Sequence, residues 1–146
     1  MKVCEAMSSE VVSISRGDTL HKAVAQMVMH HCAQVTVADD EGKLIGIVTV
    51  RDVMMPLYPD QGAYVHDSLH ARDFEEMEEN YDQVLKLNVG DVMTSNPVFV
   101  SSNDSILKAA SFMGLKNLRR IPVVDEGKQV GTLSIESINN ALFLNR

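Results

Sequence analysis

The chain has 146 residues, is 45% hydrophobic and 23% charged, and has a formal net charge of −7. This composition supports a packed core and is unlike that of a disordered chain. No apolar run reaches the roughly 18–20 residues of a membrane-spanning helix, and residues 1–10 contain no apolar signal core. We therefore expect a cytoplasmic protein. Cys4 and Cys32 lack a CxxC spacing and are predicted to be reduced thiols.

The negative charge is concentrated in one segment. Residues 58–88 contain eight acidic and two basic residues, so this segment carries −6 of the net charge of −7. The sequence shows no basic stripe, which argues against binding nucleic acid over a broad surface. A small anionic ligand that binds away from this segment would meet little repulsion.

The rest of the chain repeats itself at an offset of about 86 residues. VCEAM at 3–7 falls on VGDVM at 89–93. After the loss of one residue, GKLIGIVTV at 42–50 falls on GKQVGTLSI at 127–135. An internal repeat indicates two copies of one supersecondary unit. The sequence is therefore divided into a first repeat (1–57), an acidic insert (58–88) and a second repeat (89–146).

Each repeat predicts the element order β-α-β-β-α. In the first repeat we expect a strand near Val11–Ile14, a helix from Leu20, strands near Gln34–Ala38 and Leu44–Val48, and a helix from Val50. In the second we expect a strand near Val98–Val100, a helix from Ile106, strands near Ile121–Val124 and Gln129–Leu133, and a helix from Ile135. Asp18-Thr19 and Asp104-Ser105 supply N-cap side chains for the longer helices.

The size of the repeats and the patterns of their helices predict further contacts. About 55 residues form only a small core, so the two repeats are expected to pack on each other. The broad apolar face of the first repeat's helix predicts a homodimer; it contains Ala23, Val24, Met27 and Val28. The insert predicts an amphipathic helix from Arg72, which packs on its own domain, on a second copy or on an output partner. Its apolar face consists of Phe74, Met77, Tyr81, Val84 and Leu85.

Three stretches occur in a characteristic order: GKLIGIVTVRDV at 42–53, VMTSNPVFV at 92–100 and RRIPVVDEGKQVGTLS at 119–134. Together they resemble a CBS domain pair, also called a Bateman module. The resemblance implies an α+β fold of two tandem CBS repeats packed as a pseudo-twofold pair. It also implies a sensor that is not an enzyme and requires no cofactor. Such a module binds an adenosine-containing ligand, such as AMP, ADP or ATP, in the clefts between the repeats.

Thr49 ends a predicted strand, and Asp52 follows three residues later. In a capping box, Thr49 would accept from the N–H of Asp52, which would reach back to the N–H of Thr49. Because Asp is shorter than the usual Glu or Gln, we expect this reciprocal bond to be difficult. Alternatively, the Asp52 carboxylate accepts hydrogen bonds from two ribose hydroxyls, while Thr49 lies near a phosphate at the helix N-terminus. The resemblance favours the ligand interpretation, and Thr49 can serve both.

The second repeat differs at the matching positions. Ser134 and Ser137 stand where the first repeat has Thr49 and Asp52, so we expect one competent ribose site and one degenerate site. Arg119 and Arg120 have no basic counterparts in the first repeat. By resemblance they contact ligand phosphates, and otherwise they are solvated surface charges. The complete predicted ligand site consists of Val35, Ile47, Thr49, Asp52, Arg119, Arg120, Ile121 and Ser134.

Two other functions remain open. The chain could be a ligand-free dimerisation module, in which Asp52 is a surface residue. It could also bind metal through His66 and His70, or through the His30-His31-Cys32 stretch. No HExxH motif or cysteine pair supports this, so we predict no metal site. The two repeats leave no room for a catalytic or DNA-binding domain, so a sensor of this kind would act on a separate, unknown effector protein.

Overall fold

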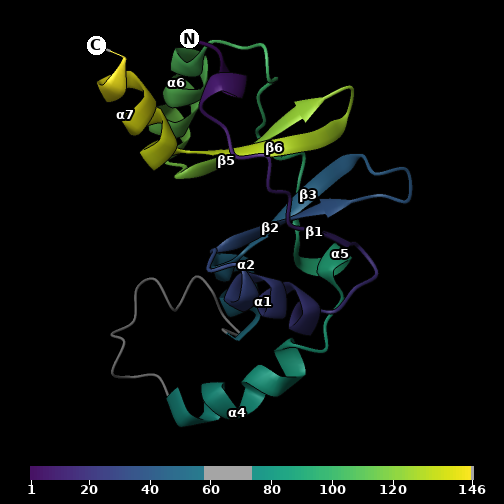
Figure 1. Ribbon diagram of the computed structural model, residues 1–146. Coiled ribbons are helices and arrows are strands. Elements are labelled where there is room, and N and C mark those ends of the chain that lie inside the picture. The colour runs from purple at the N-terminus through teal and green to yellow at the C-terminus, as the bar shows by residue number, and fades with distance from the viewer. Residues whose placement is uncertain (58–73, 146) are drawn as a thin grey trace. The chain divides into compact units, whose positions relative to one another are not determined.

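The computed structural model describes residues 1–57 and 74–145 and has an α+β fold (Figure 1). The first repeat contains the 3₁₀ helix η1 (Val3–Glu5), β1 (Ser13–Ser15), α1 (Leu20–Met29), β2 (Gln34–Ala38), β3 (Leu44–Thr49), α2 (Val50–Met54) and the 3₁₀ helix η2 (Met55–Leu57). Helix α4 (Phe74–Val84) follows in the insert. The second repeat contains α5 (Val89–Val92), β4 (Thr94–Ser95), α6 (Ile106–Lys116), β5 (Arg120–Asp125), β6 (Lys128–Ser134) and α7 (Ile135–Leu144). The predicted α+β class and the two copies of the repeat are confirmed.

The chain forms two compact units that do not coincide with the two repeats. The first-repeat unit consists of Ser13–Val37 and Gly46–Ser95. The second-repeat unit consists of Met1–Val12, Ala38–Ile45 and Asn96–Arg146. The opening segments are therefore exchanged: residues 1–12 pack with the second repeat, whereas residues 89–95 pack with the first.

In the second-repeat unit, α6 and α7 pack on each other and on the antiparallel β5–β6 pair (Figure 1). Val3 of the opening segment is 0% exposed and belongs to the same core as Ile106 and Leu133. The backbone N–H of Val3 donates to the carbonyl of Asp104 at 2.9 Å. Ser8 and Thr132 exchange two backbone hydrogen bonds, each of 2.9 Å. The opening segment is thus an integral part of this core.

In the first-repeat unit, residues 89–95 have the corresponding role. Val89 is 0% exposed, and its N–H donates to the carbonyl of Asp18 at 2.8 Å. A four-stranded sheet has the order β1-β2-β3-β4. In the insert, α4 contacts η2 and buries Val84, but Phe74 at its start is 52% exposed. The predicted apolar face of the insert helix is therefore partly covered by the residues that the structure describes, since Met77, Tyr81 and Leu85 are half-buried.

Two of the predicted strands differ in the structure. Regular β1 starts at Ser13, two residues later than expected. The predicted strand at Val98–Val100 is absent; Val100 instead forms an isolated parallel bridge with Val123. Pro97, which has no N–H to donate, immediately precedes this segment and disfavours a regular ladder. The short strand β4 lies earlier than expected, at Thr94–Ser95.

Both exchanged segments approach a strand closely at a glycine. At Gly46 in β3, an added Cβ would lie 2.7 Å from Sδ of Met93 and 2.9 Å from the carbonyl oxygen of Thr94. At Gly131 in β6, it would contact the carbonyl oxygen of Ser8, with Sδ of Met7 at 3.0 Å. The backbone of each exchanged segment therefore occupies space that any other residue would fill with its side chain.

Gly131→Ala is expected to destabilise the protein by roughly 1–3 kcal/mol, because the new methyl group collides with backbone that cannot rotate away. Urea unfolding of wild type and variant measures this difference. Gly114→Ala is a suitable control, since nothing lies within 4 Å of the added Cβ in helix α6. The control is expected to stabilise the helix by about 0.5–1 kcal/mol. Equal effects of the two substitutions would contradict a close approach at Gly131.

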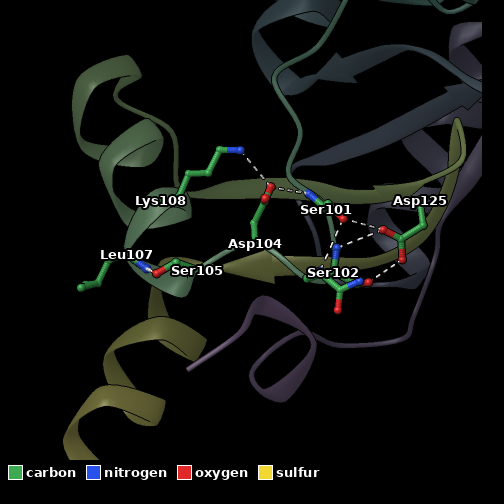
Figure 2. Close-up of polar contacts among 8 residues, drawn as sticks. Ser101, Ser102, Asp104, Ser105, Leu107, Lys108 and Asp125 are labelled. Atoms are coloured by element: carbon green, nitrogen blue, oxygen red, sulfur yellow. Dashed lines mark hydrogen bonds and ion pairs between the residues drawn. The ribbon is translucent and has the colours of Figure 1, made fainter.

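A polar network joins the loop before α6 to the end of β5 (Figure 2). Asp125 accepts from the hydroxyls of Ser101 at 2.9 Å and Ser102 at 2.5 Å, and from the N–H of Ser102 at 3.1 Å. Asp104 accepts from the N–H of Ser101 at 2.8 Å and forms an ion pair with Lys108 at 3.2 Å. The hydrogen bond from Ser102 is the main cause of the lowered pKa of Asp125, and the N–H of Ser101 is the main cause of the lowered pKa of Asp104.

These lowered pKa values predict a dependence of stability on pH. A carboxyl group with a lowered folded-state pKa stabilises the fold fully above its unfolded pKa, near 4, and this contribution is lost as the pH falls through the folded value. We expect the Asp104→Asn/Asp125→Asn variant to lose less free energy of unfolding than wild type between about pH 5 and pH 2. Urea unfolding across this range tests the prediction. Asp40→Asn, at an exposed turn position, should follow the wild-type curve.

Candidate functional site

Thr49 and Asp52 lie where β3 passes directly into α2 in the first-repeat unit. The N–H of Asp52 donates to the hydroxyl of Thr49 at 3.3 Å, and the N–H of Thr49 donates to Oδ2 of Asp52 at 2.9 Å. The expectation that the shorter side chain of Asp makes the reciprocal bond difficult is therefore wrong. With Thr49 extended at φ −112° and ψ 167°, its N–H lies within reach of the shorter side chain. Both halves of the capping box are present.

A third residue joins this pair. The hydroxyl of Thr94 donates to Oδ1 of Asp52 at 3.4 Å, and the hydroxyl of Thr49 donates to Oδ2 at 3.2 Å. Thr94 reaches Asp52 because β4 pairs antiparallel with β3, with Thr94 opposite Ile47 and Ser95 opposite Gly46. The Asp52 carboxylate thus lies among hydroxyl and amide donors, and the residue is partly exposed.

Sequence reasoning did not identify Thr94 as a site residue. The repeat shows that Thr94 is the counterpart of Ser8, because each follows the motif that opens its copy. This correspondence in the sequence could have drawn attention to Thr94. It does not reveal which copy each opening segment contacts, and this contact depends on tertiary packing.

The matching position of the second repeat contains hydroxyls only. The N–H of Ser137 donates to the hydroxyl of Ser134 at 3.1 Å, and the two hydroxyl oxygens are 2.9 Å apart. Ser134 is the N-cap of α7, as Thr49 is of α2. The local geometry of the helix start is shared by the two copies, but a carboxylate is present at the first-repeat position only.

Arg119 and Arg120 lie beside the second repeat's own helix start. The carbonyl of Arg119 accepts from the N–H of Ile135 at 3.0 Å, and Arg120 pairs with Ser134 across β5 and β6. The guanidinium of Arg119 contacts Glu136 at 3.3 Å, with both side chains largely exposed. The pKa of Glu136 is lowered by its own backbone N–H and, to a smaller extent, by Arg119. Both arginines belong to the second-repeat unit. Their contact with a ligand bound at Asp52 stays a prediction.

The remaining predicted ligand residues are apolar. Val35 and Ile121 are 1% and 0% exposed, so their side chains are part of the cores of their units. Ile47 is partly exposed and lies two residues before Thr49 on β3. Of these three side chains, that of Ile47 is the one that a ligand near Asp52 can reach without repacking of the core.

Metal-binding side chains do not gather in the described part of the chain. Among residues 1–57 and 74–145, no group of three or more His, Cys, Asp or Glu side chains could hold a metal ion. His66 and His70 lie outside the described residues. Cys4 and Cys32 are free thiols. Within the same described residues, no helix combines the length and apolar character needed to cross a bilayer.

Comparison with known sequences identifies the repeated unit. The CBS domain family model matches residues 3–58 and 89–144. A homoserine O-acetyltransferase of Methanococcus vannielii is 28% identical over 94% of this chain, which spans 24% of that protein. A CBS domain-containing protein of Dictyostelium discoideum is 26% identical, over 97% of this chain and 90% of that protein.

Solved structures agree on the fold. The CBS domain of a CBS domain containing membrane protein from Sphaerobacter thermophilus has a TM-score of 0.72 and 27% identity, covering 96% of this chain and 86% of its own. CBSX2 in complex with AMP has a TM-score of 0.73 and 23% identity, covering 99% and 98%. The CBS domain pair of protein MJ0100, in complex with 5′-methylthioadenosine and S-adenosyl-L-methionine, has a TM-score of 0.71 and 19% identity, covering 100% and 98%. Because the family model matches both copies, this chain belongs to the CBS domain family.

Proposed function

We propose that this CBS pair is a regulatory module that binds an adenosine-containing ligand through Asp52 and acts on a separate effector protein. The observation that carries the proposal is the partly exposed carboxylate of Asp52. Its two oxygens can accept a pair of hydrogen bonds from the neighbouring hydroxyls of a ribose. Helix α2 has only five residues, so the proposal rests on this carboxylate and not on the helix dipole.

The ligands of related structures support this class of compound. The AMP complex of CBSX2 and the 5′-methylthioadenosine and S-adenosyl-L-methionine complex of MJ0100 contain an adenosine group. AMP and S-adenosyl-L-methionine differ in charge and in the substituent on the ribose, whereas the ribose itself is shared. A carboxylate that reads the ribose hydroxyls would accept either compound. We therefore propose the adenosine group, and not one particular nucleotide, as the recognised feature.

A regulatory effect requires that the ligand distinguish between two states of the protein. Ligand binding shifts an equilibrium only by its difference in affinity for those states. In this proposal the effector protein contacts one state of the pair, so ligand occupancy changes how strongly the effector binds.

The rival function is a ligand-free dimerisation module, and one observation favours it. The capping box already gives both Thr49 and Asp52 a structural role at the start of α2. In this rival function, the carboxylate is present to begin the helix, and loss of its charge affects stability alone.

Asp52→Asn separates the two functions. Asparagine keeps the shape and one acceptor oxygen but loses the charge. A hydrogen bond to a charged group is worth about 1.5–3 kcal/mol, so affinity for an adenosine nucleotide should fall roughly 10- to 100-fold. Stability should fall by about 1 kcal/mol or less, the usual range for a weakened N-terminal cap. Titration calorimetry with AMP, ATP and S-adenosyl-L-methionine measures affinity, and urea unfolding measures stability.

Ser137→Asp is the reciprocal variant, because it gives the second repeat the carboxylate of the first. If the rest of that position is competent, this variant should bind additional ligand. Equal affinities of wild type and Asp52→Asn for every ligand that binds would exclude the ribose role. Absence of binding by the wild type would leave the dimerisation function.

We also propose that the chain forms a homodimer through its helices, with a corrected set of residues. Ala23 and Met27 are buried in the core of the first-repeat unit, at 0% and 6% exposure, so they are not available to a partner. Val28 on α1 is 68% exposed, and Val50 on α2 is 48% exposed. These apolar side chains, and not the buried ones, are the candidates for contact with a second copy.

Light scattering at tens of micromolar should report twice the chain mass for the wild type. Val28→Glu places a charge in the proposed contact and should shift the protein towards the monomer, because an unpaired buried charge is costly. Lys86→Glu changes charge at an exposed turn position and should leave the dimer intact. A monomeric wild type would disprove this part of the proposal.

A further inference from the structure

The Asp52 carboxylate has few free acceptor positions. An ionised carboxylate offers about four lone-pair sites on its two oxygens. Residues that the structure describes already donate three hydrogen bonds to it: from the N–H of Thr49 at 2.9 Å, the hydroxyl of Thr49 at 3.2 Å and the hydroxyl of Thr94 at 3.4 Å. Two vicinal ribose hydroxyls would require two more sites. One of the present donors therefore has to leave when a ribose binds in this way.

The three donors differ in strength and in the cost of losing them. The N–H of Thr49 belongs to the helix cap and makes the shortest bond. The hydroxyl of Thr49 is held beside the carboxylate because its oxygen also accepts from the N–H of Asp52 at 3.3 Å. Thr94 makes the longest bond and comes from a segment 42 residues away. Hydroxyl bonds are usually near 2.7–2.8 Å, so the Thr94 bond is the weakest of the three.

We infer that Thr94 is a positioning residue whose hydroxyl releases Asp52 when ligand binds. This inference rests on the proposed function of Asp52. Thr94 competes with the ribose for Oδ1 of Asp52, so its hydrogen bond favours the ligand-free state. The same residue contributes half of β4, whose pairing with β3 consists of two residue pairs. Loss of the Thr94 bond removes one of the side-chain anchors of this short strand.

The position of β4 in the chain gives this release a consequence for regulation. Ser95 is the last residue of the first-repeat unit, and Asn96 begins a segment of the second-repeat unit. Asn96 has a positive φ of 54°, a backbone conformation that Asn tolerates better than most residues. Ligand binding at Asp52 would thus release Thr94, which lies next to the point where the chain passes from one unit to the other.

Thr94→Val tests the inference, because valine preserves the β-branched shape and removes the hydroxyl. Without the competing bond, the variant should bind AMP roughly twofold to tenfold more tightly than wild type. Hydrogen exchange supplies an independent readout. In the ligand-free variant, the amides of residues 93–95 should exchange faster than in ligand-free wild type, and addition of saturating AMP to wild type should produce a similar increase. Ser95→Ala, at the neighbouring exposed position on β4, is the matched control and should leave both measurements unchanged.

The outcomes separate this inference from the function on which it rests. If wild type binds AMP but Thr94→Val binds it equally or more weakly, Thr94 does not compete with the ligand, and the inference is wrong while the proposed function stands. If AMP leaves exchange at residues 93–95 unchanged, the bond to Thr94 survives binding and the inference is again wrong. If wild type binds none of AMP, ATP and S-adenosyl-L-methionine, both the proposed function and this inference are rejected.

Discussion

A backbone segment can occupy the space of a strand residue's side chain only where that residue is glycine. Gly46 and Gly131 provide two such positions, one in each repeat. At each glycine the opening segment of the other repeat lies against the strand, and that segment also contributes a buried valine to the unit. The arrangement of both units depends on this contact. It also brings Thr94 to Asp52, because the segment that approaches Gly46 includes β4, which pairs with β3.

At the candidate site, one carboxylate combines a structural role with the proposed ligand-binding role. The hydrogen bonds that begin α2 also fix the orientation of Asp52, so the helix cap preorganises the acceptor that a ribose would use. In the second repeat, Ser134 and Ser137 maintain the helix start without the charge. The cap is therefore shared by both copies, whereas the carboxylate is specific to the first. This difference is the reason why we propose the first repeat as the principal ligand site.

The sequence alone predicted most of the local structure, because local structure depends on local patterns. The strands at 34–38 and 44–49 follow from short apolar runs bounded by turns, and the helices from Leu20 and Ile106 follow from capping residues and apolar spacing. The prediction of a strand at Val98–Val100 was wrong. Val100 forms a single bridge with Val123 in place of a regular strand pairing. The prediction that the bond between Asp52 and the N–H of Thr49 is difficult was wrong, because it considered the length of the Asp52 side chain and not the extended backbone of Thr49. Thr94 was missed because the alignment of the repeats shows that the two opening segments correspond, but it does not show which core each segment completes.

The exchange of opening segments also affects the order in which this protein can fold during synthesis. The core that buries Val3 also includes Ile138, which follows it 135 residues later in the sequence. The second-repeat unit consequently cannot form its complete core until Ile138 has been synthesised, whereas all of the first-repeat unit has been synthesised once Ser95 has been added. Contacts between residues so distant in sequence slow folding, because a long loop must close before they form. Until then Val3 lacks part of the core that buries it in the folded protein.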